Sequence, residues 1–170
     1  MLTNTEILHI ALQQSAIESC CAPGDFLKNE NVVAVSRENA GRRAYLSEPY
    51  AFDLTSYGGN AVACVREDLQ EVAYSYLAKH SVAHLFETPA LHELDVMLAP
   101  FGLKTKFQAE YFLPDARYVR ICASPYETRV LTPAAFGGLY QTEWGNALCA
   151  ERKERDMLCV GAYDCGRLVA

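Results

Sequence analysis

The chain has 170 residues, which is enough for one domain of ordinary size, or for one domain and part of another. Hydrophobic residues make up 51% and charged residues 21%, a balance typical of a globular protein that buries a core. The net charge of −6 argues against a surface for nucleic acid or for an anionic membrane.

Cysteine content and hydropathy bear on the compartment. The seven cysteines are an odd number, and no basic leader followed by an apolar core opens the chain. The apolar runs are all much shorter than a membrane span. We therefore expect a cytoplasmic protein whose thiols are reduced.

The first 65 residues are predicted to form a helix, a strand and a hairpin. Apolar residues near helical spacing indicate a helix over 4–20, which the turn-forming Ala-Pro-Gly-Asp at 22–25 ends. Residues 31–36 predict a short strand, and 37–49 a loop. The strongest hairpin signal is AFDLTSYGGNAVACV over 51–65, because Gly and Asn tolerate the positive φ of a tight turn.

Residues 66–113 are predicted to alternate between helix and strand. The first helix spans 66–79, and a short buried strand follows over 82–86. Thr88 is expected to cap the next helix, with Pro89 in its first turn, and Pro100-Phe101-Gly102 ends it. The alternation in LKTKFQAEYFL, over 103–113, predicts a long strand.

Two prolines and weak periodicity mark 115–125 as a linker. It separates an N-terminal α/β region, 1–114, from a second region, 126–170. In the second region we predict a strand over 127–131, two helices or one kinked helix from 134 to about 155, a strand over 157–163 and a terminal hairpin. The predicted fold class is α+β, with a central, mostly antiparallel sheet and flanking helices.

Two polar clusters are candidates for a metal site and for an acid–base site. Histidines 80, 84 and 92 with Glu87 suggest a metal, but His80 closes a helix and no Glu follows it as in H-E-x-x-H. Polar or capping histidines are the default, and no metal is assigned. The carboxylates and tyrosines at 53, 57, 110 and 111 suggest acid–base work, but such groups are commonplace on neighbouring strands. No catalytic residue is assigned.

The single tryptophan gives the more specific candidate. Trp144 follows Glu143 and lies close to Tyr140, at the expected junction between two helices. In one interpretation Trp144 packs in the core and Glu143 is solvated. In the other, these three residues line a substrate pocket in which Glu143 pairs with a cationic amine.

The order of elements after residue 126 carries a resemblance to a known family. The strand YETRVL, the helical PAAFGGLYQTEWGNALCAERKER, the strand MLCVGAYD, the turn CG and the strand RLVA follow one another. They resemble the start of a GNAT domain, from the superfamily of acyl-CoA-dependent N-acetyltransferases. SYGGNAVA, FETP and AEYFLPD likewise resemble the N-terminal part of a two-part bacterial GNAT-like family.

The resemblance implies transfer of acetyl from acetyl-CoA to an amine acceptor, by direct attack. Tyr140, Glu143 and Trp144 would then contribute to binding of the acceptor, a small-molecule or peptide amine. The family's later R/Q-x-x-G-x-G/A loop, which binds the pyrophosphate of acetyl-CoA, has no counterpart in these 170 residues. Acetyl-CoA is therefore the expected cofactor of the full-length family protein and is not expected to bind this chain alone.

Two further expectations depend on the same resemblance, and a third depends on the strand edge alone. Residues 88–113 resemble the end of a GNAT domain, which makes the N-terminal region a degenerate GNAT-like half. The alternative to an enzyme is a non-catalytic GNAT-like module for binding, regulation or dimerisation. An exposed strand edge at the end of the chain predicts pairing with a second copy.

Overall fold

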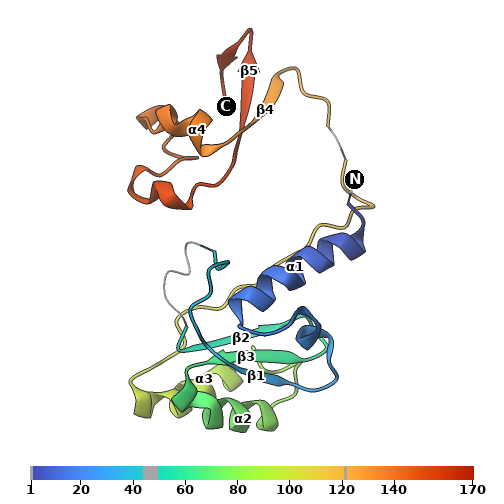
Figure 1. Cartoon of the computed structure of the whole chain (residues 1–170), viewed down its shortest axis with the longest axis vertical. Coiled ribbons are helices and arrows are strands. Elements are labelled where there is room, and N and C mark those ends of the chain that lie inside the picture. The colour runs from blue at the N-terminus through green and yellow to red at the C-terminus, as the bar shows by residue number, and fades with distance from the viewer. Residues whose placement is uncertain (1, 44–49, 121) are drawn as a thin grey trace. The chain divides into compact units, whose positions relative to one another are not determined.

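The computed structural model describes residues 2–43, 50–120 and 122–170 (Figure 1). The chain forms two compact units, Met1–Val119 and Arg120–Ala170. The boundary lies inside the predicted linker, 115–125. Each unit is described by itself.

Helix α1 (Asn4–Glu18) opens the first unit, where 4–20 predicted a helix. Its N-terminus is a capping box, in which the Glu6 N–H donates to Thr3 Oγ1 at 3.2 Å and the Thr3 N–H donates to Glu6 Oε2 at 2.7 Å. After the cap residue Ser19, Cys20 has a φ of 52°. The predicted short turn follows as a 3₁₀ helix, η1 (Pro23–Leu27).

The sheet of the first unit contains three strands in the order β1-β3-β2. Strand β1 (Val32–Val35) runs parallel to β3 (Ala61–Val65), and β2 (Phe52–Ser56) runs antiparallel to it. The predicted hairpin is confirmed: Ser56 pairs with Ala61, and Gly58 in the turn has a φ of 98°. Of the predicted loop, 37–43 contains no helix or strand, and 44–49 lie outside the described residues.

Helices cover both faces of this sheet (Figure 1). Helices α2 (Gln70–Lys79) and α3 (Thr88–Leu98) pack on the face that includes Ala61, Ala63 and Val65 of β3. Helix α1 and Phe26 pack on the opposite face, against Val62. Because both faces are covered, all five residues of β3 are buried, as is typical of a central strand between layers. The 3₁₀ helices Glu67–Leu69 and Ala99–Phe101 flank α2 and α3.

The predicted strand over 82–86 is wrong, because this segment forms turns between α2 and α3. Leu85 is fully buried and its carbonyl accepts a hydrogen bond from Tyr76 Oη at 2.6 Å. This bond holds the segment against α2, so the segment does not extend along the edge of the sheet. The cap of α3 also differs from the prediction: Glu87 is the N-cap and Thr88 the first helical residue.

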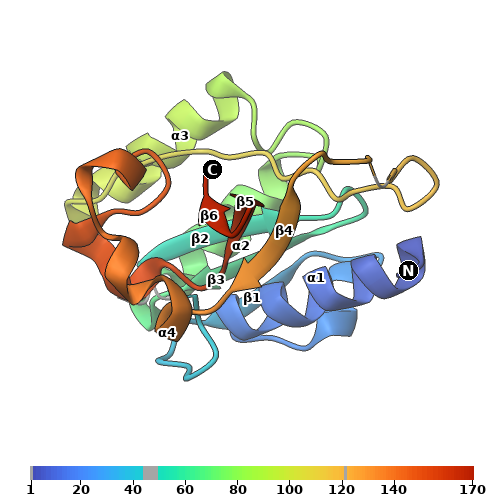
Figure 2. The same ribbon diagram turned by 90° about the horizontal axis from the view of Figure 1, so that it is seen from above.

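The predicted long strand over 103–113 is also wrong. The segment is extended but pairs with no described strand (Figure 2). Side chains hold it instead: the Thr105 N–H donates to Asp95 Oδ1 at 2.5 Å, and Gln108 Nε2 donates to the Phe86 carbonyl at 3.0 Å. The alternating pattern in the sequence therefore reflects an extended chain whose Phe107, Tyr111 and Phe112 are exposed.

The second unit contains an antiparallel sheet of three strands in the order β4-β5-β6. The strands are β4 (Glu127–Leu131), β5 (Cys159–Asp164) and β6 (Arg167–Leu168), and Val130 pairs with Val160. The predicted strands and terminal hairpin are confirmed. Cys165 and Gly166 form the turn of that hairpin, and both have positive φ.

The helical stretch between β4 and β5 is shorter than predicted. Its regular part is α4 (Pro133–Phe136), and 3₁₀ helices follow at Gly137–Leu139, Thr142–Trp144 and Ala150–Arg155. Gly137 and Gly138 interrupt the helix, since glycine is a poor helix former. A small core of Leu131, Phe136 and Leu148 joins these turns to the sheet.

The predicted α+β class is confirmed, with two small, mostly antiparallel sheets in place of one central sheet. Among the described residues, no helix has the length and apolar character that crossing a membrane requires.

Candidate functional site

The three residues predicted to bind an acceptor lie beside the core of the second unit. Tyr140 and Trp144 are both half-buried and both pack against the Leu131–Phe136–Leu148 core. Glu143 is exposed and makes no hydrogen bond or ion pair with the other described residues. The structure thus brings the two aromatic side chains to one cluster and leaves the carboxylate open to solvent.

Tyr140 has two polar neighbours that the sequence analysis missed. Its hydroxyl donates to Asp156 Oδ2 at 3.0 Å, and Lys153 Nζ lies 4.7 Å from the centre of its ring. Burial, together with the Asp156 carboxylate, raises the pKa of Tyr140 to about 12. Tyr140 therefore stays a hydrogen-bond donor at neutral pH. Asp156 directly precedes the Met-Leu run that leads into β5, but no local sequence pattern links it to Tyr140.

This arrangement suits a cationic ligand better than an anionic one. Aromatic faces and carboxylates both attract ammonium groups, and this corner contains Tyr140, Trp144, Glu143 and Asp156. Lys153 opposes this preference, since its ammonium group already occupies the ring of Tyr140. A bound amine would therefore have to displace the lysine from that ring.

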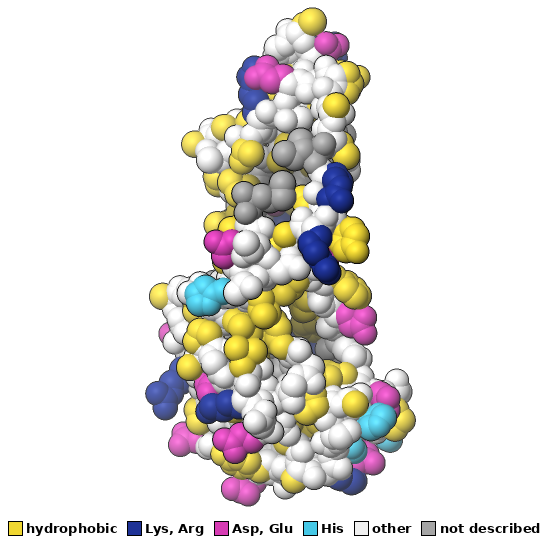
Figure 3. Space-filling model, turned by 90° about the vertical axis from the view of Figure 1, so that its right-hand side faces the viewer, with side chains coloured by type: hydrophobic (Ala, Val, Ile, Leu, Met, Phe, Trp, Pro, Cys, Tyr) yellow, Lys and Arg dark blue, Asp and Glu magenta, His cyan; other side chains and the backbone are white. Residues whose placement is uncertain are grey.

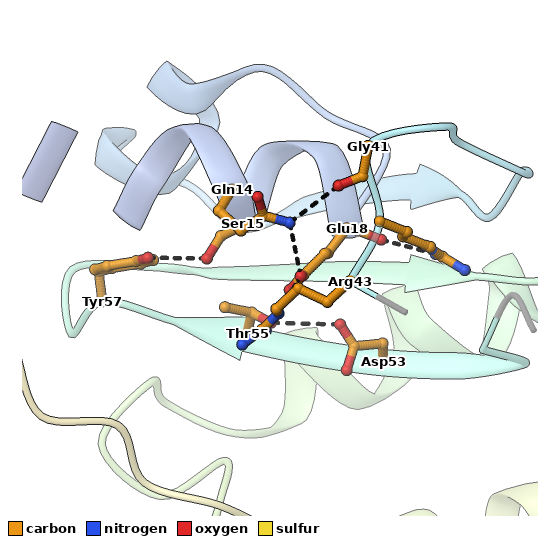
Figure 4. A network of polar contacts seen from close by, with 9 residues as sticks. Gln14, Ser15, Glu18, Gly41, Arg43, Asp53, Thr55 and Tyr57 are labelled. Atoms are coloured by element: carbon orange, nitrogen blue, oxygen red, sulfur yellow. Dashed lines mark hydrogen bonds and ion pairs between the residues drawn. The ribbon is translucent and has the colours of Figure 1, made fainter. Parts of the chain in front are cut away.

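A second polar cluster lies in the first unit, where the loop 37–43 meets the end of α1 (Figure 4). Glu18 is only 8% exposed, and its carboxylate accepts hydrogen bonds from Arg43 and, at 2.9 Å, from Gln14 Nε2. Arg42 Nη2 donates to the Glu18 carbonyl at 2.8 Å. Two arginines thus neutralise the C-terminal end of the helix, where carbonyl groups carry partial negative charge.

Arg42 has donors left for a further group. Its Nε and Nη1 are buried and have no hydrogen-bond partner among the described residues. Its guanidinium carbon lies 6.0 Å from the centre of the Tyr50 ring. A carbonyl or anionic group would satisfy these two donors.

Asp53 lies on the sheet beneath this cluster. Its Oδ2 accepts from Thr55 Oγ1 at 3.3 Å, and Tyr57, further along the chain, bonds instead to the Ser15 hydroxyl at 2.9 Å (Figure 4). Burial raises the pKa of Asp53, the nearby Glu18 adds to this, and Arg42 opposes it. The four residues considered for acid–base work, 53, 57, 110 and 111, do not form one site. The Arg43 guanidinium lies 5.9 Å from the centre of the Tyr111 ring, and Glu110 is exposed.

Replacing Asp53 with asparagine is expected to stabilise the fold at neutral pH. Since the pKa is raised in the folded state, the folded chain binds more protons than the unfolded chain, and stability falls as pH rises through this range. Asparagine does not carry the charge, so the gain should appear above about pH 4 and vanish below it. Denaturant titrations of both proteins from pH 3 to 8 measure this. A variant that is less stable at pH 7 and equally less stable at pH 3 would contradict it.

His80 and His84 each lie next to a glutamate of the first unit. His80 Nε2 lies 3.2 Å from Glu93 Oε2, and His84 Nδ1 lies 2.9 Å from Glu87 Oε1. Within the described ranges, no three His, Cys, Asp or Glu side chains are arranged to hold a metal ion. The two histidines thus contact different glutamates of the first unit.

Comparison of the chain with protein-family models, with curated proteins and with solved structures finds no match.

Proposed function

We propose that this chain is the N-terminal part of a GNAT-type N-acetyltransferase, which transfers acetyl from acetyl-CoA to a small-molecule or peptide amine. The observation that supports the proposal most is the arrangement of the second unit. A strand, short helices, a second strand and a hairpin follow one another, with antiparallel neighbours in the order β4-β5-β6. This is the succession that the sequence resemblance implies for the start of such a domain.

Under this proposal the corner around Tyr140 binds the acceptor. Trp144 and Tyr140 supply an apolar wall, and Glu143 supplies an open carboxylate for the ammonium form of the amine. Asp156 fixes the Tyr140 ring through its hydrogen bond. These residues bind and orient the acceptor; no chemical step is assigned to them.

Helix α4, the α-helix described in the second unit, does not offer a pyrophosphate site. A pyrophosphate site needs free backbone N–H groups at a helix N-terminus. In the second unit, α4 begins with Pro133, which has no N–H, and the N–H groups of Ala135 and Phe136 already donate to the Thr132 carbonyl at 2.8 and 3.1 Å. Under the proposal, acetyl-CoA binds to the R/Q-x-x-G-x-G/A loop of the full-length protein.

The test of this proposal is the coding DNA after the codon for Ala170. An open frame that continues into a further strand and an R/Q-x-x-G-x-G/A loop is the expected result. The protein from that frame should then transfer acetyl to an amine, measured by the mass of the product, because seven free thiols would disturb a thiol-based assay. A stop codon directly after Ala170 would contradict it.

A non-catalytic dimerisation module is the second candidate, and the free edge of β4 favours it. Among the described residues, β4 pairs only with β5. An antiparallel pairing of two β4 strands centred on Thr128 would place Glu127 of one copy opposite Arg129 of the other, twice. In the single chain these two exposed side chains pair with each other at 2.7 and 2.8 Å. The outer face beside this edge is apolar, since Val130 and Val160 are 69% and 67% exposed.

Charge-swap variants test this dimer. Arg129→Glu or Glu127→Arg would place like charges opposite each other at both positions, so each should weaken dimerisation about tenfold. The double variant carrying both changes restores opposite charges and should dimerise like the parent. Analytical ultracentrifugation over a concentration series measures this. A parent that stays monomeric throughout, or single variants that associate as the parent does, would exclude pairing through β4.

The proposal also places the protein in the cytoplasm, without a nucleic-acid or membrane partner. All seven cysteines of the chain are unpaired, which is typical of a reducing compartment. Acidic as well as basic side chains are visible in Figure 3, and the net charge of −6 does not favour a phosphate backbone as a partner.

A further inference from the structure

Cys20 lies in a backbone conformation that favours glycine. It follows the cap of α1 with a φ of 52°, and the next N–H, that of Cys21, donates to the Ala16 carbonyl at 3.0 Å. This is the helix ending at which glycine is the usual residue, because a Cβ is strained there. A cysteine held in this conformation suggests that its thiol has a role.

The conformation directs the Cys20 thiol to the end of the sheet. The Arg37 N–H donates to Cys20 Sγ at 3.4 Å, and the thiol donates to the Arg37 carbonyl at 3.4 Å. Arg37 directly follows Ser36, whose N–H bonds to the Val65 carbonyl at 2.8 Å and so extends the β1–β3 ladder. Cys20 therefore lies at the end of β3, next to residues 64 and 65.

Cys64 lies on the same side of the sheet as Cys20. Ala63 and Val65 face α2 and α3, so the alternation along β3 places Cys64 on the face that α1 covers. Cys64 is fully buried, and burial together with the neighbouring Cys20 thiol raises its pKa to about 12. The structure thus holds two thiols side by side, one on the central strand and one at the end of α1.

The two thiols differ in access. Cys20 lines a surface cavity of about 560 Å³, together with Ile17, Pro23 and Asn39. Cys64 does not line it. A small oxidant that enters the cavity therefore meets Cys20 first, and Cys64 reacts only with a group already formed on Cys20. Cys21 also lines the cavity, but burial raises the pKa of its thiol to about 12, as it does the pKa of Cys64, so both thiols react slowly with a free peroxide. Cys64 reacts in the second step because it lies next to the Cys20 sulfur.

We propose that Cys20 and Cys64 form a peroxide-sensitive thiol pair that closes to a disulfide between the end of α1 and strand β3. In the first step the Cys20 sulfur attacks one oxygen of the peroxide and the O–O bond breaks. Cys20 becomes a sulfenic acid, and the second oxygen leaves as water with the thiol proton. In the second step the Cys64 sulfur attacks the Cys20 sulfur, and the hydroxyl leaves as water with the Cys64 proton.

The test uses the full chain with Cys122→Ser and Cys165→Ser, because these two thiols are exposed and would react on their own. Cys21→Ser is added for peptide mapping, since no protease separates residues 20 and 21. With one equivalent of hydrogen peroxide, two free thiols should be lost per chain, and non-reducing mass mapping should find the Cys20–Cys64 link. Cys20 left reduced, or linked to any other cysteine, would overturn the proposal.

Two variants separate this pair from simple surface oxidation. In Cys64→Ser the sulfenic acid cannot condense, so dimedone should label Cys20; an unlabelled Cys20 in the folded variant contradicts the proposal. In Cys20→Gly the link is impossible, and the denaturation midpoint should rise because glycine suits the left-handed φ. If Cys20→Gly instead still consumes two thiols with one equivalent of peroxide, the pair does not include Cys20.

Discussion

Replacing Tyr76 with alanine is expected to lower the free energy of unfolding by about 3–5 kcal/mol. Tyr76 is fully buried in the core of the first unit, between α2 and the turns before α3. The change removes the whole ring and leaves the buried Leu85 carbonyl without its hydrogen-bond donor. Urea titration followed by far-UV circular dichroism measures the loss. Fluorescence is a poor probe here, because the only tryptophan lies in the other unit.

Two matched variants separate the ring from its hydroxyl. Tyr76→Phe keeps the ring and loses only the hydrogen bond to Leu85, so we expect a smaller loss of about 1–3 kcal/mol. Tyr74→Ala removes a tyrosine from the same helix, but Tyr74 is 52% exposed and should cost far less than Tyr76. Equal losses for Tyr74→Ala and Tyr76→Ala would contradict the described packing of α2.

Replacing Phe26 with alanine is expected to cost about 3–5 kcal/mol as well. Phe26 is 1% exposed and fills the space between α1 and the sheet, against Leu12, Ala16 and Val62. Its ring also meets that of Tyr57 edge to face, with centroids 5.3 Å apart. Loss of this ring removes apolar contact between α1 and the sheet, so amide exchange in α1 should accelerate more than in α2.

Leu27→Ala is the control for this prediction. It removes an apolar side chain from the adjacent position of η1, but Leu27 is 63% exposed. We expect a change within about 0.5 kcal/mol of the parent. A Phe26→Ala protein as stable as Leu27→Ala would mean that α1 is not held by this cluster.

Elements with strong local signals could be predicted from the sequence. The hairpin of β2 and β3 follows from Gly58-Gly59-Asn60, because its turn needs a positive φ. The face of α2 follows from the helical spacing of Leu69, Ala73 and Tyr76, all of which are buried. In both cases one local cause fixes the conformation, and tertiary packing agrees with it.

Elements that depend on distant contacts could not be predicted. The alternation in 103–113 is real, but whether an extended segment joins a sheet depends on a free neighbouring edge, which no local pattern encodes. Residues 82–86 have the composition of a strand, yet they form turns between α2 and α3, held by the hydrogen bond between Tyr76 and Leu85.

The same division applies to the candidate sites. The closeness of Tyr140 and Trp144 follows from their spacing on consecutive turns, and both do reach one cluster. Asp156, which accepts the hydrogen bond from Tyr140, follows the last 3₁₀ helix along the chain and could not be predicted. The cluster around Glu18 was likewise missed, because Arg43 reaches it from a loop 25 residues later.

Calorimetric titration with acetyl-CoA tests the central proposal most directly, when it is carried out on two proteins. The 170-residue chain should give no binding heat at micromolar concentrations, because it has no counterpart of the family's R/Q-x-x-G-x-G/A loop and the N-terminus of α4 offers no phosphate site. The protein translated from the whole reading frame should bind acetyl-CoA. Micromolar binding by the 170-residue chain, or no binding by the longer protein, would contradict the assignment of this chain as the acceptor-binding part of an acetyltransferase.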